Sequence, residues 1–355
     1  LSLTRIGTMR KKIRKTPKMK TKHGAEFADV RKFISDGQSF TLLTHISPDG
    51  DTLGSALALK LLLNALGKTA EVVCSNPVPK IYGFLPESET VKMPEDTEGY
   101  CRVIAVDCAD KPRFGRAVRL FDAAQAEACV DHHVTNPHYA EVNLVVSDAA
   151  ATAEIVYELY GMFGVAIDKR SAICLYTGIV TDTGNLSYSN TTPNALRIIA
   201  DFIEKKLVDV SEVNRLIYRT VPYTKTRVQG FVTSRIRLED EGRIGIGVLT
   251  RAQMLSFDAT NEDCEGIVDC VRDIDSVKIA IFIREGADGS FKVSLRSKDI
   301  GDVCRIANKF GGGGHERAAG YTAWLPLSTV VASATEAAIA ELKRDEKHDS
   351  SPDTH

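Results

Sequence analysis

The sequence predicts an α/β protein: a parallel-sheet domain with helices on both faces, joined by a helical linker to a smaller α+β domain. In the first half, short continuous apolar runs alternate with longer segments of helical periodicity, as in sheets buried on both faces. Polar residues follow several of these runs, at the end of a parallel sheet where ligands bind. In the second half, strand-like runs lie closer together, and Asp288-Gly289 between two of them is a hairpin signal.

The first half is expected to contain apolar strands and mostly amphipathic helices. Phe27, Val30 and Phe33 share one face of the first helix, and Gly67 stops the second. Because the two kinds of element alternate, we expect helices to cover both faces of a parallel sheet. The expected strands are 40–43, 71–74, 101–106 and 128–130, and the expected helices are 25–37, 53–66, 151–160 and 169–180.

The pattern changes after a connector. Helices are expected at 195–206 and 210–218, followed by a polar stretch around 221–224. Beyond it, strands are expected at 231–238, 244–250, 277–284 and 291–297, with helices at 263–272 and 302–310. We therefore divide the chain into a disordered basic tail (1–24), a first domain (25–205), a linker (206–230), a second domain (231–342) and a polar tail (343–355).

Charge is distributed unevenly along the chain. Residues 1–25 contain nine Lys or Arg and no acidic residue, so the other 330 residues carry 36 basic and 47 acidic groups, a net charge of −11. Long nucleic acids require a basic footprint, which such a body does not offer on average, so a phosphate substrate is expected to be small. The basic tail is expected to be a flexible or non-native extension, with an RNA-tethering arm as the alternative.

Targeting and redox signals favour a cytoplasmic protein. No apolar run approaches the roughly 18 residues that a membrane span needs, and no apolar segment follows the basic N-terminus as in a secretory signal. The eight cysteines are scattered without a C-x-x-C pair, and several lie in apolar runs. Such cysteines are typical of buried residues in a reducing compartment.

Carboxylates and imidazoles follow apolar segments at four places in the first half. Each motif alone is compatible with a turn or a helix cap, but their shared position predicts one site. Converging aspartates repel one another unless cations neutralise them. Oxygen and imidazole ligands without thiolate favour manganese or magnesium over structural zinc. The residues are His45, Asp49, Asp51, Asp107, Asp131, His132, His133 and Asp182.

A pair of divalent ions defines a reaction class. Two ions roughly 3.5–4 Å apart can hold the attacking and leaving oxygens of a phosphoryl transfer and generate a bridging hydroxide near neutral pH. No protein nucleophile is then required. The pattern therefore predicts a two-metal phosphoesterase in which a metal-bridging hydroxide attacks phosphorus.

These motifs resemble the DHH phosphoesterase superfamily, which is named for the Asp-His-His found here at 131–133. The resemblance extends from about residue 25 to 340. It implies that Asp131 orients a ligand and that His133 faces the substrate phosphate and assists the leaving group. It also implies metal ligands, which are His45 and Asp49 for one ion, Asp51, His132 and Asp182 for the other, and Asp107 as the bridge.

A glycine-rich stretch marks the second half. Gly311 to Gly314 let the backbone approach a ligand closely and offer N–H groups to an anion, with a flexible turn as the alternative. No Gly-Lys-Ser/Thr follows, so this is not a Walker loop. Arg296 can hold a phosphate through two hydrogen bonds, and His315 can stack on a base or donate to phosphate.

The second half resembles the DHH-associated C-terminal domain. Together, Ser294-Leu295-Arg296-Ser297 and the glycine stretch are similar to the NrnA-type oligoribonucleases, or nanoRNases, many of which also remove the 3′-phosphate of 3′-phosphoadenosine 5′-phosphate (pAp). At Cys304 those proteins often carry Asn, which leaves one polar contact in doubt. The resemblance implies that the nucleotide is held by Arg296, Gly312, Gly313, Gly314 and His315.

The expected function is the hydrolysis of short oligoribonucleotides, such as pApA, to mononucleotides, together with dephosphorylation of pAp. The expected cofactors are two divalent cations, manganese first and magnesium or cobalt as alternatives, in a cleft between the domains. The rivals are a stand-alone cyclic di-AMP phosphodiesterase and, from another class, a non-catalytic nucleotide sensor. No membrane or long nucleic-acid partner is expected, and a homodimer is compatible with the sequence.

Overall fold

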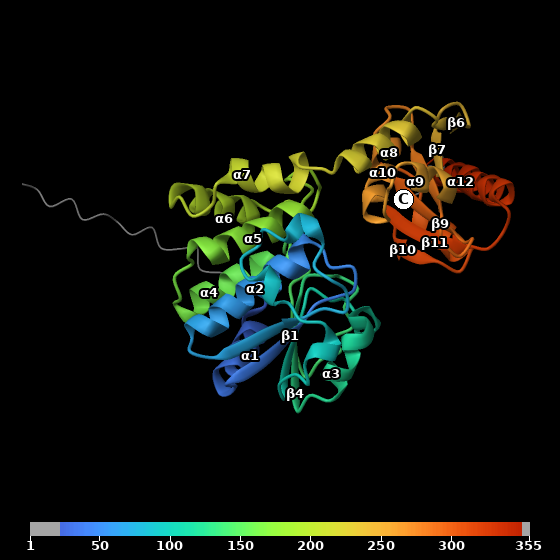
Figure 1. Cartoon of the computed structure of the whole chain (residues 1–355). Helices are drawn as coiled ribbons and strands as arrows, with labels where there is room; N and C mark the ends of the chain where they lie inside the picture. The colour runs from blue at the N-terminus through green and yellow to red at the C-terminus, as the bar shows by residue number, and fades with distance from the viewer. Residues whose placement is uncertain (1–21, 350–355) are drawn as a thin grey trace, which may run out of the picture. The chain divides into compact units, whose positions relative to one another are not determined.

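The computed structural model describes residues 22–349 of the chain, which divides into two compact units between Arg219 and Thr220 (Figure 1). We call them unit 1, up to Arg219, and unit 2, from Thr220. The expected basic tail lies outside the described residues as far as residue 21, and the expected C-terminal tail lies outside them from residue 350.

Unit 1 is built on a five-stranded parallel sheet of order β2-β1-β3-β4-β5. This confirms the predicted α/β class. The edge strand β5 was not predicted, because it is short and only its last two residues are buried. The strands are β1 (Ser39–Leu43), β2 (Thr69–Val73), β3 (Arg102–Val106), β4 (Ala126–Asp131) and β5 (Val142–Val145).

Helices cover both faces of this sheet. Leu42 and Ile104 point into a core with α1, α2, α4 and α5, while Leu43 and Val103 point to the other face, against α3 and the 3-10 segment η4 (Lys111–Ala117). Helix α2 is buried at every residue from Gly50 to Leu63, because it lies between the sheet and α5. The helices are α1 (Gly24–Asp36), α2 (Gly50–Ala65), α3 (Val118–Asp122), α4 (Thr152–Phe163), α5 (Lys169–Asp182), α6 (Pro193–Glu204) and α7 (Val210–Asn214).

Unit 2 contains a six-stranded sheet of order β10-β11-β9-β8-β7-β6, in which β7 and β8 are parallel and the other neighbours antiparallel. Helices α8 (Tyr223–Thr233), α9 (Arg251–Ser256) and α10 (Ile267–Arg272) share a core on one face, and α11 (Val303–Asn308) and α12 (Leu327–Asp349) share a core on the other. The strands are β6 (Arg237–Glu239), β7 (Ile244–Leu249), β8 (Ile279–Glu285), β9 (Phe291–Ser297), β10 (Gly313–His315) and β11 (Ala318–Ala323).

The predicted strand at 231–238 is wrong over most of its length. Helix α8 continues to Thr233, and β6 begins only at Arg237. Val228 and Val232, four residues apart, are both buried in the core beneath the helix, so the helical period decides this segment. Helix α8 also begins inside the expected linker and packs as part of unit 2.

Residues 343–349, expected to be part of a polar tail, continue helix α12. Its apolar face holds Val330, Ala334 and Ala338 in the core at intervals of four residues. Farther along, Glu341 accepts hydrogen bonds from Arg305 at 2.9 and 2.6 Å, and Asp345, inside this stretch, accepts one of 2.7 Å from the Gly301 N–H. Pairing with the rest of the unit therefore extends the helix through a stretch that is polar in sequence.

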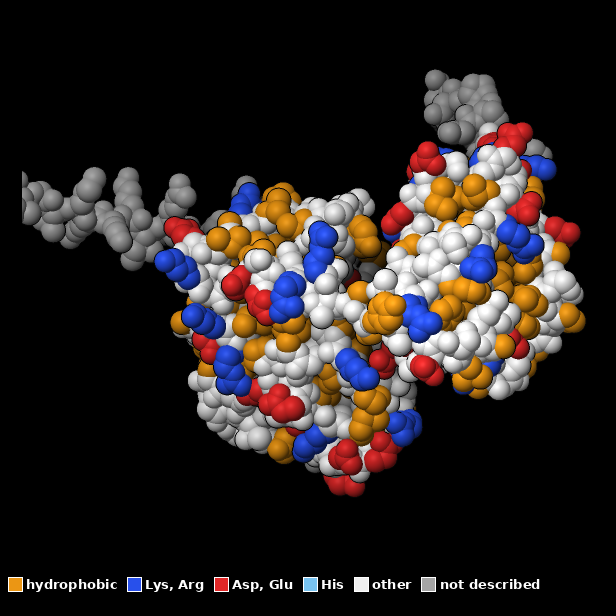
Figure 2. Space-filling view, turned by 45° about the horizontal axis from the view of Figure 1, so that its top comes forward, with side chains coloured by type: hydrophobic (Ala, Val, Ile, Leu, Met, Phe, Trp, Pro, Cys, Tyr) orange, Lys and Arg blue, Asp and Glu red, His pale blue; other side chains and the backbone are white. Residues whose placement is uncertain are grey.

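The surface of the described residues is mixed in character. On the face that Figure 2 shows, basic and acidic side chains alternate with hydrophobic ones. Among the described residues, no helix is both long enough and apolar enough to cross a membrane. All eight cysteines are free thiols.

Candidate metal centre and substrate-binding surface

The predicted ligand residues of unit 1 meet at the carboxyl ends of the strands. In the strand order, β1 has β2 on one side and β3 on the other, so the chain reverses its direction across the sheet there. Such a switch point opens a crevice that binds ligands. His45 lies two residues beyond β1, Asp107 directly follows β3, and His132 directly follows β4.

One ligand group consists of His45, Asp49 and Asp107. The Nε2 atom of His45 lies 3.6 Å from Asp49 Oδ2 and 3.7 Å from Asp107 Oδ2. The other ring nitrogen, Nδ1, lies 2.8 Å from the carbonyl oxygen of Ile46 and donates its proton there. Nε2 therefore presents a lone pair to the carboxylates, as in a metal-binding histidine.

A second ligand group consists of Asp51, His132 and Asp182. His132 Nε2 lies 3.4 Å from Asp182 Oδ2 and 4.0 Å from Asp51 Oδ2. Its Nδ1 atom faces the carbonyl oxygen of Ala149 at 3.3 Å, so the two histidines are oriented in the same way.

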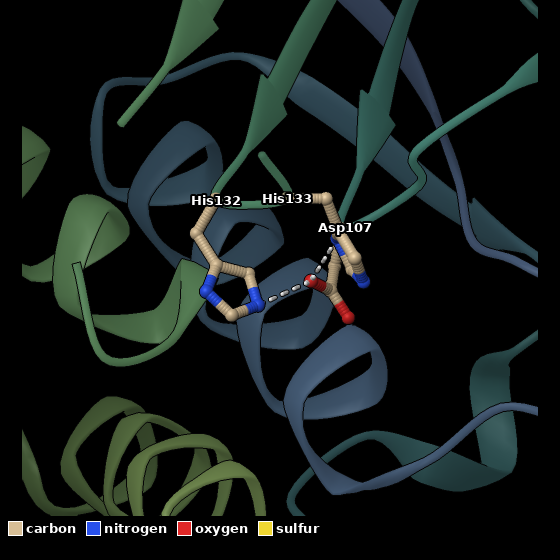
Figure 3. A group of neighbouring side chains, drawn as sticks. All are labelled: Asp107, His132 and His133. Atoms are coloured by element: carbon tan, nitrogen blue, oxygen red, sulfur yellow. Dashed lines mark ion pairs between the residues drawn. The ribbon is translucent and has the colours of Figure 1, made fainter. Parts of the chain in front are cut away.

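Asp107 belongs to the first group and also forms a third set of possible ligands with His132 and His133. Its Oδ2 atom faces His45. Its Oδ1 atom lies 3.7 Å from His132 Nε2 and 3.8 Å from His133 Nδ1 (Figure 3). The residue has a φ of 57°, in the left-handed region that Asp tolerates better than most residues. Thr152 Oγ1 donates a hydrogen bond of 2.8 Å to Oδ1. The backbone and Thr152 thus fix a carboxylate that can contact two ions.

Asp51 is held by the N-terminus of α4. The backbone N–H groups of Thr152 and Ala153 donate to its carboxylate at 2.6 and 3.0 Å, and Ser55 Oγ donates at 2.9 Å. Gly178 lets α5 pass close by, because a Cβ atom there would lie 2.6 Å from Asp51 Oδ1. Sequence reasoning missed Thr152. Its two partners, Asp107 and Asp51, lie 45 and 101 positions earlier in the chain, and no local pattern links such distant residues.

The centre carries more negative charge than its surroundings stabilise. Burial and the carboxylates of Asp51 and Asp49 raise the pKa of Asp107 well above its usual range. Burial and the charge of Asp51 raise the pKa of Asp182 to about 7. Burial lowers the pKa of His132, but the charges of Asp51 and Asp182 outweigh it and raise that pKa. Carboxylate oxygens and oriented imidazoles under such repulsion fit divalent cations.

Asp131 orients His133 beside these groups. The Asp131 carboxylate is fully buried and accepts hydrogen bonds from His133 Nδ1 at 2.7 Å and Asn136 Nδ2 at 2.6 Å. Burial alone would raise its pKa, but the contacts with His133 and Asn136 lower it. His133 Nδ1 is therefore engaged by Asp131, which leaves Nε2 as the atom that can serve a substrate. Asn136 was not singled out from the sequence.

In unit 2, three strands bring Arg296 and His315 to one surface. Ala318 on β11 pairs with His315 on β10 and with Arg296 on β9. Leu295 and Ala319 are buried in the core, so Arg296 and Ala318 point to the other face of the sheet. At about 4.8 Å between strands, His315 and Arg296 are roughly 10 Å apart, with the small Ala318 between them. We call this arrangement the Ala318 shelf.

The glycine stretch, read as a loop or a flexible turn, is partly a strand. Gly312 and Gly314 are required by packing, because a Cβ atom would overlap Gly320 at the first and Ala318 at the second. Gly314 also has a φ of 145°. At Gly313 the nearest atom to a Cβ would be Asn308 Oδ1, at an ordinary 3.8 Å. The fold therefore does not require glycine at 313.

Arg296 has a partner that the sequence did not reveal. Its Nε atom lies 3.5 Å from Asp269 Oδ1, an oxygen that also accepts a hydrogen bond of 2.9 Å from Arg272. Cys304, where an Asn was expected, places Sγ 3.0 Å from the carbonyl oxygen of Gly314. The side chain at 304 therefore supports the backbone of the glycine stretch.

Comparison with known proteins defines the class. The model of the DHH family, N-terminal domain, matches residues 39–179, and that of the DHHA1 domain matches residues 246–344. The chain belongs to the DHH family of phosphoesterases.

Individual relatives extend the match along the chain. This chain is 34% identical over 306 residues to the bifunctional oligoribonuclease and PAP phosphatase NrnA of Thermus thermophilus, and the aligned region covers 85% of this chain and 90% of that protein. It is 31% identical over 283 residues to the probable NrnA of Streptococcus mutans, covering 79% and 88%. An exopolyphosphatase-related protein from Bacteroides fragilis has the same fold, with a TM-score of 0.85, 25% identity, and coverage of 89% and 96%.

Proposed function

We propose that this protein is a two-metal phosphoesterase that hydrolyses short oligoribonucleotides to mononucleotides and removes the 3′-phosphate of pAp. The observation that carries the proposal is the pair of ligand groups around Asp107. The 34% identity to a relative named oligoribonuclease and PAP phosphatase supports the substrate class. Unit 1 supplies the metal ligands, and unit 2 supplies the substrate contacts.

The ligand set favours manganese, with magnesium and cobalt as alternatives, because imidazole accompanies the carboxylates. Such ions, when bound, stabilise charge on phosphoryl oxygens and lower the pKa of water. Each histidine ligand already has its Nδ1 atom engaged by a carbonyl oxygen, so little reorganisation is needed. The proposed ligands are His45 and Asp49 for one ion, Asp51, His132 and Asp182 for the other, and Asp107 for both.

Both reactions break the same bond, which explains how one site serves two substrates. In pApA and in pAp, the bond that is hydrolysed joins phosphorus to a 3′-oxygen, and that oxygen leaves with a proton. We infer that His133 provides this proton from Nε2, and the hydrogen bond by which Asp131 holds Nδ1 supports this role. The Asn136 amide keeps Asp131 in position.

The Ala318 shelf is the proposed surface for the nucleotide. Arg296 offers a planar guanidinium to a phosphate, and His315 stacks on a base or donates to phosphate. The spacing of roughly 10 Å across two strands suits one nucleotide over a floor without large side chains. Gly313 and its glycine neighbours present backbone at the edge of the shelf.

We also place the reaction in the cytoplasm. The eight free thiols, several of them buried, fit a reducing compartment. Burial raises the pKa of Cys129 to about 12, which keeps that thiol protonated and unreactive beside the centre.

The test is a product-resolved hydrolysis assay with manganese, in which pApA, pAp and cyclic di-AMP are compared side by side. Fast release of AMP from pApA and pAp, with cyclic di-AMP untouched, is the expected result. Comparable turnover of cyclic di-AMP would favour a cyclic dinucleotide phosphodiesterase. Binding without turnover of any of the three would favour a nucleotide sensor and contradict the proposal.

A further inference from the structure

A basic segment lies where unit 2 begins. Between Arg219 and Leu238 the sequence contains five basic residues and no acidic one, although the chain beyond residue 25 has a net charge of −11. None of the five forms an ion pair with another residue of the described chain, whereas Arg215 and Arg243, just outside the segment, both do. The five are Arg219, Lys225, Arg227, Arg235 and Arg237.

Aromatic rings alternate with two of these cations. Tyr223, Arg227, Phe231 and Arg235 are spaced four residues apart along α8 and its C-terminal end, so they follow one side of the helix. The Arg227 guanidinium lies 5.8 Å from the centre of the Tyr223 ring, and that of Arg235 lies 4.0 Å from the Phe231 ring. We call these four residues the α8 stripe.

Neighbouring groups extend the stacking. Phe257 lies 4.9 Å beneath the Arg227 guanidinium and packs edge-on against Phe231, with ring centres 5.3 Å apart. Gly230 is exposed, with no atom within 4 Å of where its Cβ would be, so there is room beside the rings.

Of the four stripe residues, Phe231 packs against the core and the other three are exposed. Helix α8 is anchored to unit 2 by Val228 and Val232, which are buried. Tyr223 is 77% exposed, and Arg227 and Arg235 are exposed as well. A large exposed ring beside unpaired cations fits a ligand that is anionic and has flat faces. Single-stranded nucleic acid combines these properties, and proteins bind it with basic grooves and aromatic stacking.

The stripe ends at a cavity. Arg235 and Arg237 line a space of about 780 Å³ between β7 and the start of α12. Its other polar lining includes Gln253 and Thr335 and two carboxylates, Glu239 and Glu336, which face the same space. Its floor includes Ile246 and Val331. A base can cover this apolar floor, while its phosphates meet the two arginines at the rim.

We propose that the α8 stripe and this cavity bind the part of a single-stranded RNA that extends beyond the nucleotides being hydrolysed. The stripe lies over the β7 end of the sheet, and the Ala318 shelf lies on β9, β11 and β10 at the other end, so the two surfaces are separate. The inference rests on the proposed function for RNA as the ligand. It implies that RNA longer than the few nucleotides of the expected substrate is also bound, whereas the net charge of the body argued against long nucleic acids.

The test separates binding from turnover. Binding of a labelled single-stranded RNA of about ten nucleotides to the full chain is followed by fluorescence anisotropy in EDTA, and pApA hydrolysis is measured with manganese. The variant is Arg227→Ala combined with Arg235→Ala. The control is Arg344→Ala, which removes one positive charge from an exposed position on α12. The basic N-terminal segment is present in every protein, so it does not affect the comparison.

The double variant is expected to raise the Kd for RNA at least tenfold and to leave kcat/KM for pApA within twofold of wild type. The salt dependence of binding should fall by about 1.4 in slope for two lost phosphate contacts. Tyr223→Ala should weaken binding, and Tyr223→Phe should retain it.

Unchanged RNA binding in the double variant, or an equal loss in Arg344→Ala, would overturn the inference. If the wild-type protein does not hydrolyse pApA, the proposed function is refuted. The comparison of RNA binding between the wild type and the variants would still test the α8 stripe.

Discussion

Asp107 is the residue on which the proposed centre depends most. Its two carboxylate oxygens face different histidines, and a left-handed backbone and Thr152 hold it there. If both ions use it, Asp107→Ala should lower kcat/KM for pApA on the order of a thousandfold, since metal ions supply several kcal/mol and each 1.4 kcal/mol is tenfold. The exposed Asp122→Ala is the control and should be unaffected. Retained manganese-dependent turnover in Asp107→Ala would refute the shared ligand.

Two neighbouring glycines, Gly312 before β10 and Gly313 at its start, are expected to differ in role: the first is required by packing and the second contacts substrate. Gly312 is packed against Gly320 and Tyr321, so Gly312→Ala should lower the free energy of unfolding by about 1–3 kcal/mol. Gly313 has room for a methyl group within the fold, so Gly313→Ala should leave the Tm unchanged and raise KM for pApA. Thermal melts measure the stability effect of each substitution, and steady-state kinetics measure its effect on KM. A Gly313→Ala protein with wild-type KM would remove this residue from the proposed substrate surface.

At the scale of elements, the contact between α2 and α5 positions the second ligand group. Gly178→Ala would push a methyl group against Asp51 and Ala153. We expect a loss of stability of about 1–3 kcal/mol and weaker manganese binding, because Asp51 must move. Gly161→Ala, on the exposed side of α4 with open space around it, should instead stabilise by about 0.5–1 kcal/mol. Equal effects of the two changes on metal binding would contradict this account.

The elements also show where sequence reasoning fails. Strand β10 and helix α12 depend on partners far along the chain, such as Ala318 for His315 and Arg305 for Glu341. The segment from Phe231, which includes the last turn of α8, was read as a strand because its aromatic and β-branched residues favour strands. The burial of Val228 and Val232 at a helical spacing reversed that preference. The apolar strands of unit 1 were predictable because their signal lies within each run.

At the scale of the whole molecule, the expected metal and substrate ligands could be predicted from the sequence, whereas the residues that hold them in position could not. The motif residues could be selected because their chemistry and strand-end positions are visible in the sequence. Thr152, Asn136 and Asp269 could not, because Thr and Asn are common in turns and caps, and each acts only through a contact formed on folding. The assigned roles of both groups remain predictions.

The charge of the centre predicts how pH and metal together affect the stability of the protein. Without metal, the pKa of Asp182 is raised to about 7 in the folded protein, above its value in the unfolded chain. The folded state then binds the proton more tightly, so this stabilisation is present at low pH and is lost as pH rises from about 4 through 7. The metal-free protein should therefore have a lower Tm at pH 8 than at pH 5.5, and manganese should raise the Tm more at pH 8. An equal metal effect at both pH values would contradict the prediction.

The most direct test of the central claim is an anomalous difference map from crystals grown with manganese. We predict two peaks roughly 3.5–4 Å apart, with Asp107 contacting both, since that spacing allows two ions to act on one phosphoryl group. His45 and Asp49 should contact one peak, and His132 and Asp182 the other. A single peak, or two peaks that do not share Asp107, would contradict the two-metal account.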